Sequence, residues 1–398
     1  MSQRFHTRLT AAAMLASTLA LSACTWGYKP PAPTPLQANP AQVSAQEAWR
    51  NTVGNGATLP MQIAVQGDQV LVANTHGQVE AFSASNGASA WSAQVGQPLS
   101  AGVGFDGHTA AVITAKAELV AIRNGQVLWR VPLKNQSSTA PLVAGGRVFV
   151  LASDYTVSAY DGNNGFLLWS QKSSMPSSRL ALQQSSLLMP AYGALFAGVA
   201  GNIVSFNPDT GEALGDLPLA SPRGATDLSQ VVDVLMPASR LGNSLCARAY
   251  QATVGCIGLS DGKLEWVQPH IGSSGISGNG QIVVGADNQD VLTGWARQNG
   301  QVVWKNESFK HRQLSAPLVV GNSIIVGDAQ GYVHILSATN GELRNRIRID
   351  DSAIQVAPVL AGNTVVVVSS KGTVAGLRIQ ETTIQPIASW NQQLATGN

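Results

Sequence analysis

The chain has 398 residues, of which 24 are basic and 22 acidic, so its formal net charge is +2. This near-neutral balance argues against a nucleic-acid-binding protein, which would carry a marked excess of basic residues. Charged residues make up 12% of the chain, about half the usual share, and 40 residues are glycine. That composition is typical of a turn-rich all-β protein and excludes a largely helical or disordered chain.

Residues 1–23 have the features of a lipoprotein signal peptide. A basic start is followed by an apolar stretch, Leu9 to Leu21, that is too short for a mature transmembrane helix. The tetrapeptide that ends at Cys24 resembles the bacterial lipobox, which implies cleavage before Cys24 and a lipid on its sulfur. An ordinary secretory signal with a chance cysteine is the alternative. Cleavage would leave the mature chain with equal numbers of basic and acidic residues.

Residues 24–45 are predicted to form a tether that begins at the lipidated Cys24. Five prolines between Lys29 and Pro40 favour a semi-rigid extended chain. Thr25 is not the aspartate that, by resemblance to bacterial sorting rules, retains a lipoprotein in the inner membrane. This implies a lipid-anchored protein on the periplasmic face of the outer membrane.

Between residues 46 and 380, a unit recurs that consists of a short apolar run, a tight polar or glycine-bearing turn and a second apolar run. Branched and aromatic residues fill the runs, which predicts strands rather than helices. The units follow one another at intervals of about 40 to 50 residues, the period of a propeller blade. The eight copies are 69–82, 110–122, 147–160, 194–206, 244–257, 281–295, 323–336 and 364–377.

A Gly-x-x-x-Trp motif keeps step with these units. It occurs at Gly87/Trp91, Gly125/Trp129, Gly165/Trp169, Gly262/Trp266 and Gly300/Trp304, is degenerate at Gly211/Gly215 and Gly341/Asn345, and is flanked by Trp49 and Trp390. We expect these rings to fill the gaps between adjacent blades, with substrate stacking as the alternative. The repeats predict a single domain over residues 46–380, an all-β, eight-bladed β-propeller of four-stranded antiparallel blades.

Closing the ring requires a strand from one end of the chain. The last unit supplies three strands of its own, so a strand at Glu47–Val53, which contains Trp49, is expected to complete the last blade. Residues 382–390 compete for the same place. On the preferred reading, residues 381–398 form a C-terminal tail.

Two cysteines, Cys246 and Cys256, remain after lipidation. They flank the turn around Gln251 symmetrically, and directly opposed residues on antiparallel strands lie within disulfide range. An oxidising periplasm favours a disulfide between them, and two buried free thiols are the alternative.

No sequence motif indicates catalysis. The six histidines are scattered, and the chain contains no His-Glu-x-x-His, Cys-x-x-Cys, Gly-x-Ser-x-Gly or P-loop motif. We therefore expect a non-enzymatic protein with no cofactor, no metal ion and no nucleic acid bound.

The blade motif is similar to the Ala-x-Asp-x-x-x-Gly-x-x-x-Trp repeat of pyrroloquinoline-quinone-type propellers, as residues 81–91 and 159–169 illustrate. A pyrroloquinoline-quinone-dependent periplasmic dehydrogenase is therefore the enzyme alternative, although the adjacent cysteine pair of that cofactor site is missing. Lipobox, proline-rich tether and eight repeats together resemble the BamB family of outer-membrane assembly lipoproteins. That resemblance implies a monomeric scaffold of the BAM complex. Its expected partners are the POTRA domains of BamA, other BAM lipoproteins and unfolded β-barrel precursors.

Two consecutive connectors between blades, 172–188 and 216–234, are longer than the others. Connectors emerge at one end of a propeller, so these two should be neighbours, and long loops on a rigid scaffold tend to carry function. By resemblance to the BamB family, they would bind BamA through a Leu-x-Leu-Arg and an Asp-x-Asp stretch. The corresponding residues are Arg179, Leu180, Leu182, Gln183, Asp233 and Leu235, with Gln183 in place of the expected arginine and Leu235 in place of the second aspartate.

Overall fold

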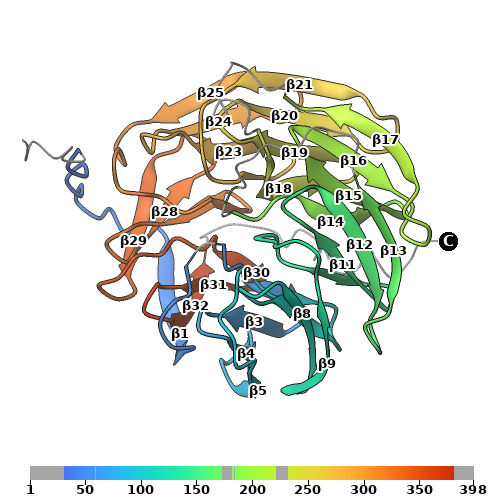
Figure 1. The fold of residues 1–398 in the computed structure, drawn as a ribbon. Coiled ribbons are helices and arrows are strands. Elements are labelled where there is room, and N and C mark those ends of the chain that lie inside the picture. The colour runs from blue at the N-terminus through green and yellow to red at the C-terminus, as the bar shows by residue number, and fades with distance from the viewer. Residues whose placement is uncertain (1–30, 59, 173–181, 183, 221–231, 381–398) are drawn as a thin grey trace, which may run out of the picture. The chain divides into compact units, whose positions relative to one another are not determined.

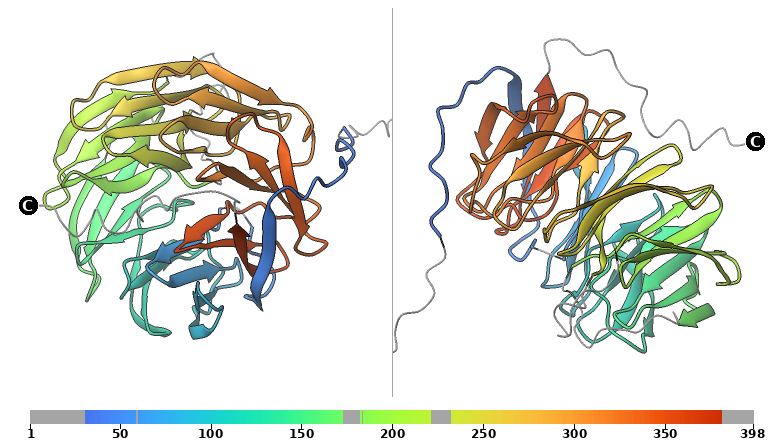
Figure 2. Two further views of the ribbon diagram at one scale, coloured as in Figure 1. Left: turned by 180° about the vertical axis from the view of Figure 1, so that it is seen from behind. Right: turned by 90° about the horizontal axis from the view of Figure 1, so that it is seen from above.

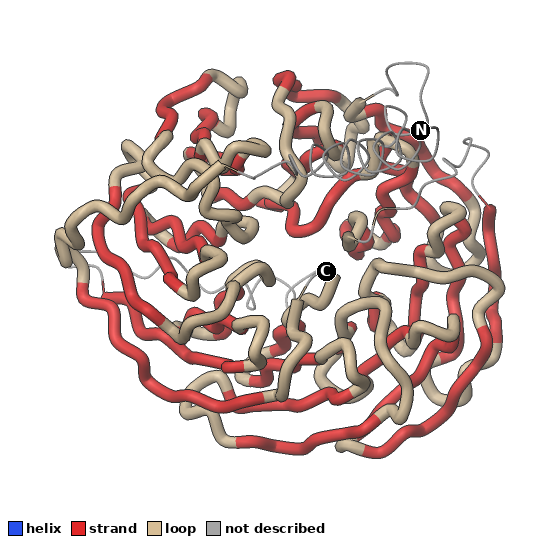
Figure 3. The backbone as a smooth tube through the Cα atoms, turned by 60° about the vertical axis from the view of Figure 1, so that its left-hand side comes forward, coloured by secondary structure: helices blue, strands red, loops and turns tan. Residues whose placement is uncertain are grey.

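The structure is a computed structural model that describes residues 31–58, 60–172, 182, 184–220 and 232–380. Contacts divide the chain into Met1–Pro33 and Thr34–Asn398, and all 32 described strands belong to the second unit. Strands and loops alone make up the described residues (Figure 3). Within these ranges, no helix is long and apolar enough to span a membrane.

The strands form eight four-stranded antiparallel sheets arranged as the blades of a propeller (Figures 1 and 2). The predicted fold is therefore confirmed. Blades 1 to 7 each use four strands that are consecutive in the sequence, and the fourth strand lies at the outer edge.

The first four blades are built from the following strands. Blade 1 contains β2 (Ala64–Gln66), β3 (Gln69–Ala73), β4 (Gln78–Ser83) and β5 (Ser89–Gln94). Blade 2 contains β6 (Gly104–Phe105), β7 (Ala110–Ile113), β8 (Glu118–Arg123) and β9 (Gln126–Pro132). Blade 3 contains β10 (Leu142–Ala144), β11 (Arg147–Leu151), β12 (Thr156–Asp161) and β13 (Leu167–Lys172). Blade 4 contains β14 (Leu188–Ala191), β15 (Ala194–Val199), β16 (Asn202–Phe206) and β17 (Ala213–Pro218).

The remaining blades follow the same plan except for the last. Blade 5 contains β18 (Val234–Leu241), β19 (Ser244–Ala249), β20 (Thr253–Gly258) and β21 (Leu264–Pro269). Blade 6 contains β22 (Ser277–Gly278), β23 (Ile282–Ala286), β24 (Leu292–Ala296) and β25 (Val302–Asn306). Blade 7 contains β26 (Leu318–Val320), β27 (Ser323–Gly327), β28 (Tyr332–Ser337) and β29 (Leu343–Arg348). Blade 8 contains β30 (Val359–Ala361), β31 (Thr364–Val368), β32 (Thr373–Gln380) and, from the other end of the chain, β1 (Ser44–Thr52).

The strand next to β32 in blade 8 is β1, so the two ends of the propeller share one sheet. The pairing runs from Ser44 opposite Gln380 to Thr52 opposite Thr373. In Figure 2 the blue β1 lies beside the red strands of the last blade. Residues 382–390, the competing candidate for this position, lie outside the described residues.

Burial explains why the second and third strands of each blade read as continuous apolar runs. Every residue of β27 and β31 is buried, because neighbouring blades cover both faces of these strands. The fourth strands are open to solvent, as in β13, where five of six residues are exposed. In the sequence, the Gly-x-x-x-Trp motif therefore marks fourth strands that hydrophobicity does not reveal.

Four of the five motif tryptophans, together with Trp49, join adjacent blades as expected. Trp91 makes no such hydrogen bond among the described residues, and Trp390 lies outside them. In five places an outer-strand indole donates its Nε1–H to a carbonyl of the next blade, in the turn between that blade's third and fourth strands. The turn glycine lies against the ring, so that an added Cβ would approach it to within 2.4–2.8 Å. The pairs are Trp49–Ala84 (2.8 Å), Trp129–Gly162 (3.0 Å), Trp169–Pro208 (3.0 Å), Trp266–Arg297 (2.6 Å) and Trp304–Ala338 (3.0 Å).

Residues 34–43 lie against blade 7. The backbone N–H of Thr34 donates to the carbonyl of Lys310 (2.9 Å), and that of Gln42 donates to the carbonyl of Arg344 (2.7 Å). Further hydrogen bonds join Gln37 to Ser308 and Arg346, Asn39 to Asn345 and Arg346, and Val43 to Asn345. From Thr34 onward this segment is thus part of the propeller surface, although the sequence predicts a tether up to residue 45. Because Lys310 lies in the connector between β25 and β26, Thr34 lies at the connector end of the propeller.

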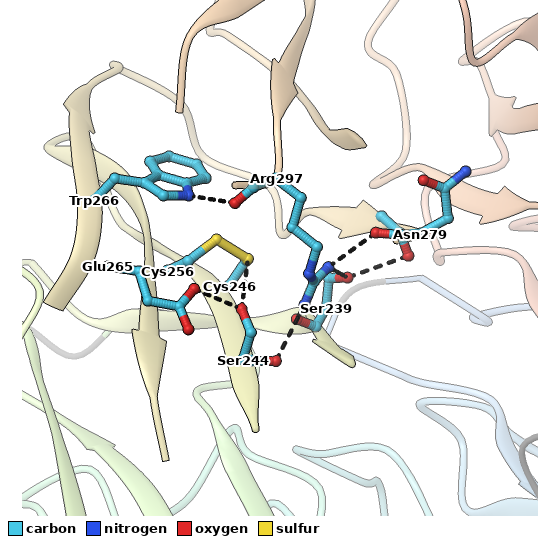
Figure 4. The surroundings of a disulfide bond; sticks show 9 residues. Ser239, Ser244, Cys246, Cys256, Glu265, Trp266, Asn279 and Arg297 are labelled. Carbon is cyan, nitrogen blue, oxygen red and sulfur yellow. Dashed lines mark hydrogen bonds between the residues drawn. A yellow bond between two sulfur atoms is a disulfide. The ribbon is translucent and has the colours of Figure 1, made fainter. Parts of the chain in front are cut away.

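Blade 5 contains a disulfide between Cys246 and Cys256, which are directly opposed on β19 and β20 (Figure 4). Both cysteines are fully buried, and they share an apolar cluster with Trp266. Beside them, the guanidinium of Arg297 in blade 6 donates to the carbonyls of Ser239 (2.9 Å) and Ser244 (3.1 Å) in blade 5. The disulfide therefore lies where blades 5 and 6 meet.

Candidate protein-interaction site

The two enlarged connectors run from β13 to β14 and from β17 to β18, at the end of the propeller where all connectors between blades emerge. Of the residues expected to bind a partner, Leu182 is half-buried at the end of the first connector. Arg179, Leu180 and Gln183 lie outside the described residues, as does the lipidation candidate Cys24.

The described ends of the two connectors are hydrogen-bonded to each other. Ser186 and Leu235 form an isolated antiparallel bridge. On either side of it, the N–H of Leu187 donates to the carbonyl of Val234 (2.8 Å), and the N–H of Met236 donates to that of Ser185 (2.9 Å). The expectation that the two long connectors are neighbours is therefore confirmed for these ends.

Asp233 is buried, with only 6% of its surface exposed. Its carboxylate accepts a hydrogen bond from the hydroxyl of Tyr155 (2.6 Å), in the turn between β11 and β12 of blade 3, and its carbonyl accepts one from the N–H of Tyr250 (2.8 Å). Burial raises the pKa of Asp233, while the bond from Tyr155 opposes that rise. Burial and the adjacent carboxylate also raise the pKa of Tyr155. Asp233 therefore fixes the second connector against blade 3.

Leu235 is completely buried and packs inside blade 5. Asp233 and Leu235 are both buried, so in this structure their side chains position the connectors. Their direct contact with a partner stays a prediction. Asp233 is predicted to contact a partner only through the resemblance to the BamB family. It stands in the apolar stretch Val232-Asp233-Val234-Leu235, and its carboxylate is buried against Tyr155, a residue 78 positions away. The apolar neighbours of Asp233, and a tyrosine in a tight turn where polar or small residues are usual, are the signals of this burial in the sequence.

The described residues enclose a cavity of about 410 Å³ at the connector end of the propeller. A second cavity, of about 390 Å³, lies at the opposite end. Residues from six blades line the cavity at the connector end, so it lies on the propeller axis. Gln184 and Met236, at the ends of the two long connectors, are among them, together with Met61, Leu314 and Val356. Methionine and aliphatic side chains form an adaptable apolar surface, so this hollow can receive an apolar side chain presented beside the connectors.

A buried arginine and a histidine lie close to this cavity. The guanidinium of Arg248 donates to the carbonyl of Ala286 (2.5 Å) and to Nδ1 of His270 (3.0 Å). Burial lowers the pKa of Arg248 to about 10. Burial, followed by the positive charge of Arg248, lowers the pKa of His270 to about 4, with Asp287 opposing and Lys305 adding to the shift. His270 is therefore held as a neutral hydrogen-bond acceptor.

This arrangement predicts a specific loss of stability in acid. As the pH falls below about 6.5, the unfolded chain binds a proton at His270 while the folded chain does not, so the free energy of unfolding decreases. The decrease continues until the pH reaches about 4, where the folded chain is protonated too. Between pH 7 and pH 4.5 we expect the wild-type free energy of unfolding to fall by about 2 kcal/mol more than that of a His270→Gln variant. Urea unfolding at both pH values measures this, with His108→Gln as the exposed-histidine control. Equal pH dependence of the wild type and His270→Gln would contradict the assignment.

Comparison with known proteins identifies the family. A family model described as outer membrane protein assembly factor BamB matches residues 75–306 and 307–398. The chain belongs to the BamB family. The outer membrane protein assembly factor BamB of Burkholderia pseudomallei (strain K96243) is 32% identical over 348 residues, which cover 87% of this chain and 91% of that protein.

BamB and its relatives share their fold with other propellers. The crystal structure of BamB from Moraxella catarrhalis has a TM-score of 0.76 at 22% identity and covers 84% of this chain and 100% of that one. The quinohemoprotein alcohol dehydrogenase from Comamonas testosteroni has a TM-score of 0.66 at 12% identity, covering 89% and 79%. Both likenesses are likenesses of fold alone. Among the residues described for this BamB-family chain, no group of three or more His, Cys, Asp or Glu side chains is placed to hold a metal ion.

Proposed function

We propose that this protein is a non-enzymatic scaffold lipoprotein of the outer-membrane β-barrel assembly machinery, and that it binds the POTRA domains of BamA with its two long connectors. Membership of the BamB family carries this proposal. It is supported by the hydrogen bonds that join the ends of the connectors, since a preformed surface loses less conformational freedom on binding. Leu180 and Leu182 supply the apolar contact, and Asp233 and Leu235 hold the connectors in place.

The position of Thr34 is consistent with a lipid anchor at Cys24 on the periplasmic face of the outer membrane. Thr34 is ten positions after Cys24, and a fully extended segment of that length spans at most about 35 Å. Because Thr34 lies at the connector end, the anchor keeps that end within this distance of the membrane.

For unfolded β-barrel precursors, the outer strands of the blades offer a mode of binding that does not depend on sequence. An extended polypeptide can add to an unpaired strand edge through its backbone. Outer strands of blades 2 to 6 also expose apolar side chains, including Leu128, Leu167, Leu214, Leu264 and Val303. In blade 7, by contrast, residues 34–43 already lie along the outer strand.

Replacing Leu180 and Leu182 together by alanine is expected to reduce recovery of BamA about tenfold in a pull-down from detergent-solubilised outer membranes, since two apolar anchors of an interface are removed. A double variant of the exposed β25 residues, Val302→Ala with Val303→Ala, is the matched control and should recover BamA normally. Unchanged melting temperatures confirm that both variants fold. Normal recovery by the leucine variant would contradict the proposed site.

The enzyme alternative has its own readout. A pyrroloquinoline-quinone-dependent dehydrogenase would show quinone absorbance and dye-linked alcohol oxidation after addition of cofactor and calcium. We expect neither.

A further inference from the structure

The second cavity, of about 390 Å³, lies between blades 2 and 3. It is lined by the turns that join first to second and third to fourth strands, which emerge at the end opposite to the connectors. Blade 2 contributes Asp106 to Thr109 and Arg123, and blade 3 contributes Gly146 and Asn163. This cavity is therefore separate from the proposed BamA-binding site.

A shortened turn in blade 2 accounts for the space. Ala121 pairs with Trp129 across this turn, whereas the equivalent pairs in blades 1 and 3, Ala81 with Trp91 and Ala159 with Trp169, enclose two residues more. In blades 1 and 3 the longer turn reaches over the blade and donates a backbone hydrogen bond to the turn between the first two strands, from Ala84 to Asp68 (2.6 Å) and from Gly162 to Gly146 (2.8 Å). No such bond occurs among the described residues of blade 2. The missing turn residues leave the cavity open.

Arg123 brings a positive charge into this cavity without an acidic partner. Its Nη2 donates to Oγ1 of Thr109 (3.0 Å) and, at 3.4 Å, to Oδ1 of Asn163, both of them neutral acceptors. Its Nε is buried and has no acceptor. None of the ion pairs found among the described residues includes Arg123, whereas nearby Arg147 pairs with Asp209 (2.6 Å).

The one carboxylate in the cavity is already used within its own turn. Oδ1 of Asp106 accepts the backbone N–H groups of His108 (2.9 Å) and Thr109 (2.8 Å), which holds it as the cap of the turn. The guanidinium of Arg123 is thus held by two neutral side chains, and some of its N–H groups have no acceptor among the described residues. A carboxylate would complement these N–H groups and the positive charge, because it forms charge-assisted hydrogen bonds with a guanidinium.

The rim of the cavity indicates what kind of molecule would carry that carboxylate. The turns that line the cavity lead directly into β9 and β13. Leu128 in β9 is 40% exposed, Leu167 in β13 is 52% exposed, and Phe166, in the turn just before β13, is 72% exposed. Exposed apolar side chains on unpaired strand edges suit an extended apolar polypeptide. A phosphate dianion fits less well, since a single unpaired guanidinium faces it and Asp106 would repel it.

We propose that this cavity binds a carboxylate carried by an extended, apolar polypeptide segment, with Arg123 as the recognition residue and the edges of β9 and β13 as the apolar rim. The carboxylate is either an aspartate or glutamate side chain or the carboxyl terminus of the chain. This proposal deepens the precursor-binding part of the proposed function and rests on it.

Fluorescence anisotropy with dye-labelled hexapeptides of alternating valine and threonine tests the proposal on the full mature chain. One peptide ends in a free carboxylate, a second ends in an amide, and a third is amidated but carries one internal glutamate. We expect Arg123→Gln to weaken binding of the charged peptides about tenfold, the loss of one charge-assisted hydrogen-bonding group, and to leave binding of the neutral amide unchanged. Comparison of the first and third peptides distinguishes the two sources of the carboxylate.

Arg378→Gln is the matched control, because Arg378 lies at the same end of the propeller, outside the cavity. Among the described residues, its guanidinium bonds to neutral acceptors on Asn363 and Ser85. It should bind all three peptides as the wild type does. Equal binding of the charged peptides to the wild type and Arg123→Gln, or no binding of them to the wild type, would overturn the proposal. So would competition by inorganic phosphate that exceeds competition by acetate. The BamA pull-down tests the opposite end of the propeller, so its result can contradict BamA binding without contradicting carboxylate binding at Arg123, and the reverse also holds.

Discussion

Replacing Asp328 by alanine is expected to lower the free energy of unfolding by about 3–5 kcal/mol, because it leaves a buried arginine without its counter-charge. Asp328 is fully buried in blade 7, and one of its oxygens accepts hydrogen bonds from Nε and Nη2 of Arg312 (2.9 and 2.6 Å) and from Nε2 of His334 (2.9 Å). Burial alone would raise the pKa of Asp328, but these hydrogen bonds and charges lower it, so the carboxylate is ionised. Arg312 is 3% exposed and cannot recover its solvation when the carboxylate is removed.

The same change should loosen the N-terminal segment. Nη1 of Arg312 donates to the carbonyl of Thr34 (2.9 Å), so the network that Asp328 holds in place also anchors residues 34–43. Urea unfolding gives the stability, and limited proteolysis within residues 34–43 gives the second readout. The control is Asp351→Ala, which removes an exposed ion pair with Lys371 (2.6 Å) and should change little. If Asp328→Ala were no less stable than Asp351→Ala, the buried network would not hold blade 7 together.

Replacing Gly300 by alanine is expected to cost about 2–4 kcal/mol of folding free energy, the sum of backbone strain and overpacking. Gly300 has a φ of +70°, a conformation that L-residues adopt only at a cost, and a Cβ built on it would lie 2.4 Å from Cε3 of Trp266. The ring cannot withdraw freely, since its Nε1 donates to the carbonyl of Arg297 in the same turn (2.6 Å). The substitution therefore forces blades 5 and 6 apart.

Gly67→Ala separates the two contributions to this loss. Gly67 has a φ of +60°, but nothing lies within 4 Å of the position that its Cβ would occupy. It should therefore lose about 1 kcal/mol, the backbone cost alone. Thermal and urea unfolding of both variants measure the difference. Equal losses would mean that the contact between glycine and tryptophan adds nothing to the joint between blades.

The proposed interaction site shows which features a local stretch of sequence predicts and which it does not. The lengths of the two connectors are a local property, and they correctly indicated that the described ends of these loops are neighbours at one end of the propeller. The roles of Asp233 and Leu235 were not accessible in the same way. Whether Asp233 faces solvent depends on Tyr155 in a different blade, and no pattern of neighbouring residues reports that contact.

Arg123 shows the same limit of prediction from sequence, here for a residue that faces a cavity. Its shortened turn, Asn124-Gly125, is visible in the sequence when the blade motifs are aligned. The consequence of the shortening is visible only in space, because the empty volume arises between turns of two blades whose residues are far apart along the chain.

By itself the sequence determined the class of the protein, the number of blades and the role of the tryptophans. Each blade is a local unit whose apolar runs, turns and Gly-x-x-x-Trp motif repeat within about 40 to 50 residues. The sequence favours an N-terminal strand in the last blade, and the pairing of β1 with β32 confirms it. Only the tertiary structure decided that residues 34–43 lie on blade 7, and that Asp233 is buried while Arg123 faces a cavity. Those features are set by contacts between residues of different blades, and such contacts exist only once the ring has closed.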